Sequence, residues 1–188
     1  MAVIEAVAAE RGCELFVPDF GDLSVEPLAG AALRRFSRKG RGFETRLLGS
    51  YQPFNAALAL TAVDVLRGRG WAISDEAAFA GIASARWPGR FEVVGTAPLT
   101  IVDGGHNPQG AEALAASLAD LLGEEGCASV DFALGVLADK DYPAMVRVVA
   151  PWARSFSVYA PKSPRALAAD ELEACVREIM VEEGRADD

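Results

Sequence analysis

The sequence has 188 residues, of which 51% are hydrophobic and 24% are charged, a composition typical of a folded globular chain. Its formal net charge of −9 argues against nucleic acid or an anionic membrane as a main partner, because both require a basic surface. No apolar stretch is long enough to cross a membrane, and the N-terminus lacks the pattern of a signal peptide, so we expect a cytoplasmic protein.

The charge is unevenly distributed along the chain. Residues 1–86 contain 10 Lys+Arg and 10 Asp+Glu, whereas residues 87–188 contain 8 and 17, so the whole acidic excess lies in the second part. This shift predicts a boundary between two domains near Trp87.

The first part mixes helices with a hairpin. We expect a helix over residues 1–12, a strand in "ELFVP" (14–18), a loop over 19–30, strands in 33–48 around the turn "RKGRG", a helix after Pro53 and another after Ser74 that "ARWPGR" ends. The second part alternates apolar strands with amphipathic helices. That alternation predicts an α/β domain with a parallel sheet, its strands in "FEVVG", "LTIVD", "SVDFALGVL" and "SFSVYAP".

The only histidine lies in "TIVDGGHNPQG", directly after a predicted strand. Asp103 ends that strand and His106 precedes the next helix, at the edge of a parallel sheet where ligands bind. Gly104 and Gly105 allow a tight turn and a close approach by a ligand. The alternative is ordinary loop chemistry, with an aspartate that caps the helix and a satisfied surface histidine.

Arg90, and the pair Gln52 and Asn55, also have both a possible binding role and an ordinary structural alternative. Arg90, in "PGRFE", can reach phosphate oxygens from the domain junction, or it can simply face solvent. Gln52 and Asn55 are amide side chains in the first turn of an apolar helix, where local capping is the alternative role.

Loops after two later strands carry charge at the same edge. Asp139 and Lys140 lie in "LADKDY", and Ser163 and Arg165 lie in "PKSPRAL". A cationic rim in an acidic domain suits a carboxylate substrate, while a solvated turn is the alternative.

Several catalytic motifs are absent from the sequence. It contains no GxxxxGK[ST] phosphate loop, GxGxxG, HExxH or GxSxG. Cys13, Cys127 and Cys175 are far apart and lack metal-ligand spacing, so we expect buried small hydrophobes and no metal site in these residues.

Four separated motifs together resemble the folylpolyglutamate synthase/dihydrofolate synthase family of ATP-dependent Mur-type ligases. They are "LLGSYQPFNAALAL", "RWPGRFEVVGTAPLTIVDGGHNPQGAEAL", "GVLADKDY" and "SPRAL", in this order and spacing over nearly the whole chain. The resemblance implies that residues 1–86 form the end of a Mur-ligase central ATPase domain. It implies for 87–188 a Rossmann-like three-layer C-terminal domain with a mainly parallel sheet, lacking a final helix and strand.

The resemblance also assigns roles to residues. It implies that Asn55 contacts the adenine side of ATP, Arg90 the phosphates and Asp103 the ribose, with His106 in the same cleft. Other contacts, to substrate or across a closing domain interface, would come from Gln52, Asp139, Lys140, Ser163 and Arg165. The family usually has His where this chain has Tyr51, which leaves aromatic stacking but no ring-nitrogen role. The usual "DGAHNP" is "DGGHNP" here, a change expected to loosen the turn.

The implied reaction is the ATP-dependent addition of L-glutamate to folate or dihydropteroate through an acyl phosphate, with Mg²⁺ as a cofactor. The phosphate loop, the magnesium ligands and the modified lysine of the family would lie in an ATPase domain upstream of Met1, so we expect the chain alone to be inactive. Two alternatives stay open: another Mur-type amino-acid ligase, and a non-catalytic module that binds a nucleotide or folate.

Overall fold

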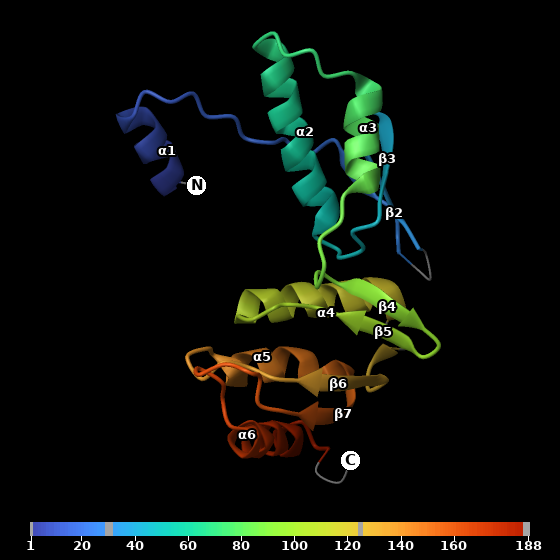
Figure 1. Cartoon of the computed structure of the whole chain (residues 1–188), viewed down its shortest axis with the longest axis vertical. Helices are drawn as coiled ribbons and strands as arrows, with labels where there is room; N and C mark the ends of the chain where they lie inside the picture. The colour runs from blue at the N-terminus through green and yellow to red at the C-terminus, as the bar shows by residue number, and fades with distance from the viewer. Residues whose placement is uncertain (1, 29–31, 124–125, 186–188) are drawn as a thin grey trace.

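The computed structural model describes residues 2–28, 32–123 and 126–185, which form two bodies along the long axis of the molecule (Figure 1). We call residues 2–28 and 32–84 the first lobe, and residues 92–123 and 126–185 the second lobe. Within the described ranges, no helix is long and apolar enough to span a membrane.

The first lobe is built on a three-stranded antiparallel sheet covered by two helices. Its strands pair in the order β1-β2-β3, and Arg38 pairs with Arg41 across the β2–β3 turn. Phe36, Phe43 and Leu60 form its core. The elements are α1 (Ala2–Glu10), β1 (Leu23–Val25), β2 (Arg34–Arg38), β3 (Arg41–Thr45), α2 (Gln52–Gly68) and α3 (Asp75–Ser84).

The segment before this sheet departs from the sequence-based prediction. α1 is helical as expected, but it stands away from α2, and its apolar residues Val3, Ile4 and Val7 are exposed (Figure 1). The predicted strand over 14–18 is wrong, because this stretch pairs with no described strand. The strand β1 lies instead inside the predicted loop, where pairing with β2 stabilises three residues of weak local preference.

The cysteines also differ from expectation. Cys13 and Cys127 are exposed and Cys175 is half-buried, so the prediction that all three are buried is wrong. Cys13 and Cys127 lie in loops next to a helix and a strand, whereas Cys175, on α6, packs against the core of the second lobe.

The second lobe confirms the α/β class. β6 and β7 are parallel, while β4 and β5 form an antiparallel hairpin whose two-residue connection is too short for a crossover. The parallel pairing in the described structure is therefore less extensive than a mainly parallel sheet. The core of the second lobe centres on Val146, Leu172 and Ile179. The elements are β4 (Glu92–Thr96), β5 (Leu99–Val102), α4 (Pro108–Leu122), β6 (Val130–Leu134), α5 (Tyr142–Val149), η2 (Ala150–Trp152), β7 (Ala153–Val158) and α6 (Ala169–Glu182).

Candidate functional site

A cavity of about 400 Å³ is lined by residues of both lobes. The start of α2 contributes one wall, and the end of β5 with the start of α4 contributes the other. Four of the residues predicted from the sequence lie in it: Gln52, Asn55, Arg90 and Asp103. The remaining lining residues are Leu47, Tyr51, Trp87, Gly105, Gln109, Gly110 and Ala113.

Asp103 is held by backbone amides on two sides. Its Oδ2 accepts a hydrogen bond from the Phe91 amide at 2.8 Å, and its Oδ1 accepts one from the Gly105 amide at 2.7 Å. Phe91 is 1% exposed and has a φ of +46°, a left-handed conformation that the carboxylate and the buried ring stabilise together. Asp103 therefore fixes the backbone next to Arg90, so the two charged residues keep a defined spacing.

The start of α4 and the turn before it show whether Asp103 caps the helix. Asn107, rather than Asp103, caps α4, because its Oδ1 accepts from the Gly110 amide at 2.7 Å. A Cβ at Gly105 would lie 2.9 Å from Asp103 Oδ1 and 3.3 Å from Gly110. Gly105 thus leaves little room for a side chain, and the capping alternative for Asp103 is wrong.

Gln52 and Asn55 pair with each other at the cavity. Asn55 Nδ2 donates to Gln52 Oε1 at 3.1 Å, and Gln52 is 6% exposed whereas Asn55 is exposed. The N-cap residue of α2, Tyr51, makes no side-chain cap. The two amides therefore form a polar pair at the wall of the cavity in place of a helix cap.

Tyr51 lies between the two lobes. Its ring packs over Gly49, where a Cβ would lie 2.8 Å from Cε1, so glycine is needed there for the ring to keep its position. Partial burial, and then the negative charge of Asp103, raise the pKa of the Tyr51 phenol, while Arg90 acts in the opposite direction. The phenol thus stays protonated and able to donate at neutral pH.

His106 and the later loop residues lie outside this cavity. The imidazole of His106 is exposed on the turn, with Nδ1 3.1 Å from the Gly104 carbonyl oxygen. The other four predicted residues come together in a separate cluster. Within it, Arg165 Nη2 lies 2.5 Å from Asp139 Oδ2 and Lys140 Nζ lies 3.6 Å from the same oxygen, while Ser163 Oγ accepts from the Arg165 amide at 3.2 Å.

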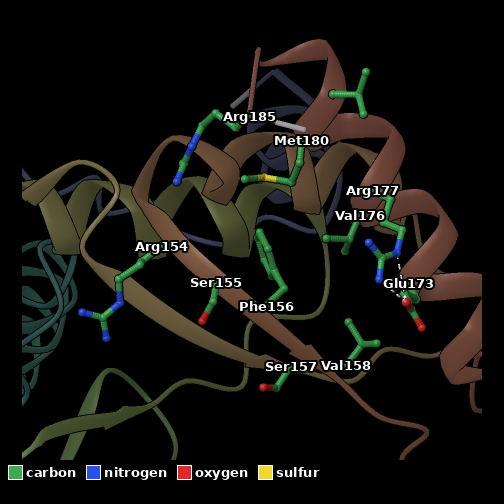
Figure 2. Close-up of a pocket in the computed structure, with 11 residues that line it drawn as sticks. Arg154, Ser155, Phe156, Ser157, Val158, Glu173, Val176, Arg177, Met180 and Arg185 are labelled. Carbon is green, nitrogen blue, oxygen red and sulfur yellow. Dashed lines mark hydrogen bonds and ion pairs between the residues drawn. The ribbon is translucent and has the colours of Figure 1, made fainter. Parts of the chain in front are cut away.

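Another cavity, of about 570 Å³, runs along β7 and α6 and contains none of the predicted residues (Figure 2). Its arginines are engaged locally: Arg177 pairs with Glu173 within α6, and Arg154 pairs with Asp131 of β6. Size alone therefore does not identify the functional site. Across the described ranges, no three His, Cys, Asp or Glu side chains form a group that could hold a metal ion.

No role was predicted for Trp87 or Gln109, which also line the interlobe cavity. Trp87 is 65% exposed although it has the largest apolar side chain in its loop. In the sequence it marks the predicted domain boundary and the end of a helix, and its position three residues before Arg90 is the signal that could have identified it.

The cavity lies where an α/β domain meets a second lobe, and interfaces between domains are a preferred place for ligand sites. Residues 89–187 match the family described as "Mur ligase, glutamate ligase domain", and the chain belongs to the Mur ligase family.

Two curated proteins illustrate which members of this family the chain resembles in sequence. The chain is 36% identical over 126 residues to folylpolyglutamate synthase of Lacticaseibacillus casei, covering 66% of this chain and 28% of that protein. It is 38% identical over 128 residues to dihydrofolate synthase/folylpolyglutamate synthase of Mycobacterium tuberculosis, covering 67% and 26%. The chain thus spans little more than a quarter of the length of these curated relatives.

Solved structures match the whole fold. Folylpolyglutamate synthase of Mycobacterium tuberculosis complexed with ADP and AMPPCP superposes with a TM-score of 0.80 at 28% identity, over 100% of this chain and 41% of that one. FolC of Escherichia coli in complex with DHPP and ADP gives 0.72 at 27% identity, over 99% and 45%.

Proposed function

We propose that this chain is part of an ATP-dependent ligase that adds L-glutamate to folate or dihydropteroate, and that the interlobe cavity is its nucleotide site. The observation that carries the proposal is the convergence of Arg90, Asp103 and Asn55 on one cavity lined by both lobes. The names of the relatives support the reaction, and the ADP-bound structures of two of them support the ligand.

The chemistry of the cavity suits a nucleotide. Arg90 is half-buried and makes no ion pair with any residue in the described ranges, so its guanidinium is available to phosphate oxygens. The Asp103 oxygens hold backbone amides but retain lone pairs that can accept ribose hydroxyls. The Gln52 and Asn55 amides can recognise the base edge, and 400 Å³ lies within the range of ligand pockets.

When bound, ATP supplies the phosphoryl group that activates the folate or pteroate carboxylate for attack by the amine of glutamate. The residues of this chain bind and orient: Arg90 neutralises phosphate charge, and Asp103 fixes the ribose. We place His106 near the same cleft, and assign glutamate binding or closure of the domain interface to the cluster of Asp139, Lys140, Ser163 and Arg165.

No three His, Cys, Asp or Glu side chains in the described ranges group together to hold a metal ion by themselves, so in this proposal Mg²⁺ binds to the phosphates of ATP and to additional polypeptide, and we derive no metal-dependent step from the residues of this chain. Activity in this proposal needs additional polypeptide, because the chain covers only 28% and 26% of the two curated relatives; we assign to it the ATPase domain. We place the enzyme in the cytoplasm, where ATP is supplied and exposed thiols such as Cys13 stay reduced.

Calorimetric titration of the chain with ADP and with a non-hydrolysable ATP analogue tests the site. Arg90→Ala should weaken nucleotide binding roughly 10- to 100-fold, the scale of a lost charge-assisted contact. Asp103→Ala should weaken it as well, with some loss of stability because the Phe91 and Gly105 amides lose their acceptor.

Arg177→Ala is the matched control, since it removes an arginine paired only with Glu173 on α6. It should bind nucleotide like the wild type. Wild-type affinity in the folded Arg90→Ala and Asp103→Ala variants, or no binding by the wild type, would reject the proposed site.

A further inference from the structure

A cavity of about 260 Å³ lies beneath the β2–β3 hairpin, against the last turns of α2 and the start of α3. It is remote from the proposed nucleotide site, because Asp64 and Gln52 are 12 residues apart on one helix, roughly 18 Å along its axis. Its function therefore does not depend on the reaction proposed above.

The cavity carries an excess of positive charge. Four cations and two carboxylates line it, a local balance of +2 in a chain whose net charge is −9. The cations are Arg38, Lys39, Arg41 and Arg67, and the carboxylates are Asp64 and Asp75.

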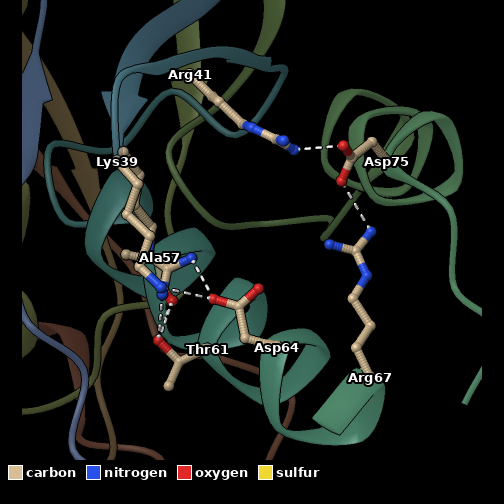
Figure 3. A network of polar contacts seen from close by, with 8 residues as sticks. Lys39, Arg41, Ala57, Thr61, Asp64, Arg67 and Asp75 are labelled. Carbon is tan, nitrogen blue, oxygen red and sulfur yellow. Dashed lines mark hydrogen bonds and ion pairs between the residues drawn. The ribbon is translucent and has the colours of Figure 1, made fainter. Parts of the chain in front are cut away.

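Each carboxylate is shared by two cations (Figure 3). Asp64 Oδ2 lies 3.0 Å from Arg38 Nη1 and 3.1 Å from Lys39 Nζ. Asp75 lies 2.5 Å from Arg41 Nη1 and 3.1 Å from Arg67 Nη2. Two anions thus hold four cations in place, and several of the donor groups remain unused.

Arg38 has a buried donor without a partner. The residue is 7% exposed, its Nη1 donates to Asp64, and its Nη2 donates to Thr61 Oγ1 at 3.0 Å. The Thr61 hydroxyl donates in turn to the Ala57 carbonyl oxygen at 2.8 Å, which fixes the arrangement (Figure 3). Arg38 Nε has no hydrogen-bond partner among the residues that the structure describes, a costly state for a buried charged group.

The apolar wall of the cavity favours an anion in this position. The rings of Phe43 and Phe79 line the cavity, with centroids 4.8 Å apart, and their apolar surface strengthens nearby electrostatic interactions.

We propose that this cavity is a binding site for a phosphate group, either inorganic phosphate or the phosphate of a small monoester. A tetrahedral dianion would match the local excess of two positive charges and accept from several guanidinium and ammonium donors at once. The alternative is an ion-pair network that only fastens the hairpin to α2 and α3.

Site-resolved NMR on the complete chain tests this proposal. Titration with inorganic phosphate, at an ionic strength held constant with sodium chloride, should shift the Arg38 Nε–H resonance saturably. Arg41→Gln should weaken that response at least about tenfold, because it removes one excess cation. Phenyl phosphate distinguishes the source: tighter binding than inorganic phosphate at the same resonance indicates a monoester with an apolar body.

Two matched variants locate the effect. Arg177→Gln removes a paired arginine on α6, and Arg90→Ala removes the cation of the proposed nucleotide site; both should leave the Arg38 response unchanged. The proposal is overturned if the wild-type Arg38 resonance does not respond to phosphate, if sodium chloride alone produces the same change, or if folded Arg41→Gln responds like the wild type.

Discussion

At the scale of single residues, the interlobe cavity brings the exposed indole of Trp87 together with the charged side chains of Arg90 and Asp103. The two charged residues are candidates in the sequence because a guanidinium and a strand-end carboxylate next to glycines can hold a ligand, although a solvent-facing arginine and ordinary loop chemistry are the alternatives there. Trp87 is not a candidate, because an aromatic residue in a loop before Pro88 is equally typical of a domain junction. Its place in the cavity depends on how the lobes meet, which no local pattern encodes.

Trp87 makes a direct prediction about nucleotide binding. Its indole is 65% exposed and lines the cavity, so a bound nucleotide should change its surroundings and its fluorescence. We expect ADP to alter the emission of the wild type and Trp87→Phe to abolish most of this change, with an affinity about fivefold weaker if the indole contacts the ligand. Trp71→Phe is the matched control, because Trp71 is 64% exposed and lies outside the cavity. An ADP-dependent change that persists in Trp87→Phe would contradict the assignment.

At the scale of elements, prediction succeeded where a strand or helix carries its own periodicity and caps. α4 begins at Pro108, in the helix expected after His106, and α3 begins after Ser74, whose Oγ accepts from the Ala77 amide. The prediction failed for β1, which is a strand through its pairing with β2. It also failed for residues 14–18, whose apolar residues pair with no strand in the described structure. Strand pairing between distant segments is a tertiary property, and alternation in one segment cannot reveal it.

The β6–β7 pair provides a prediction about pH. The side chains of Arg154 and Ser155 on β7 bond to Asp131 on β6, and hydrogen bonding from Arg154, then Ser155, lowers the pKa of Asp131 to about 2. A carboxylate with a lowered pKa stabilises the fold fully above its ordinary pKa of about 4, and this contribution is lost as the pH falls through about 2. Asp131→Asn should therefore lower the melting temperature at pH 6, and the difference from the wild type should vanish towards pH 2.

Arg154→Ala serves as the partner control for this experiment. In that background, Asp131→Asn should have a much smaller effect at pH 6, as a double-mutant cycle measures. If the difference in melting temperature between the wild type and Asp131→Asn stays constant from pH 6 to pH 2, ionised Asp131 paired with Arg154 is not the cause of that difference.

At the scale of the whole molecule, α4 joins the two lobes through a buried contact that the sequence did not reveal. Arg34 is 1% exposed, and its Nη1 lies 2.5 Å from Asp120 Oδ2, while its Nε donates to the Leu48 carbonyl oxygen at 2.7 Å. Leu118 packs in the same apolar cluster as Leu48. From the sequence, Arg34 is a strand residue and Asp120 a surface charge on a helix. Only the relative placement of the lobes makes them a pair.

This contact predicts a specific pattern of stability and binding. Asp120→Ala leaves Arg34 buried without its counter-charge, which should cost about 3–5 kcal/mol in the free energy of unfolding, measured with urea. Replacing both partners, Arg34→Met with Asp120→Leu, should cost less, because no buried charge then remains. Glu44→Ala, which breaks the exposed pair with Arg35, should cost under about 1 kcal/mol. Asp120→Ala should also weaken ADP binding through altered lobe spacing, with Arg90 and Asp103 intact. If Asp120→Ala costs no more than Glu44→Ala, the lobes are not held together by this pair but by the other contacts between them, which are the apolar cluster of Leu48 and Leu118 and the hydrogen bonds between Ser50 and Ser117.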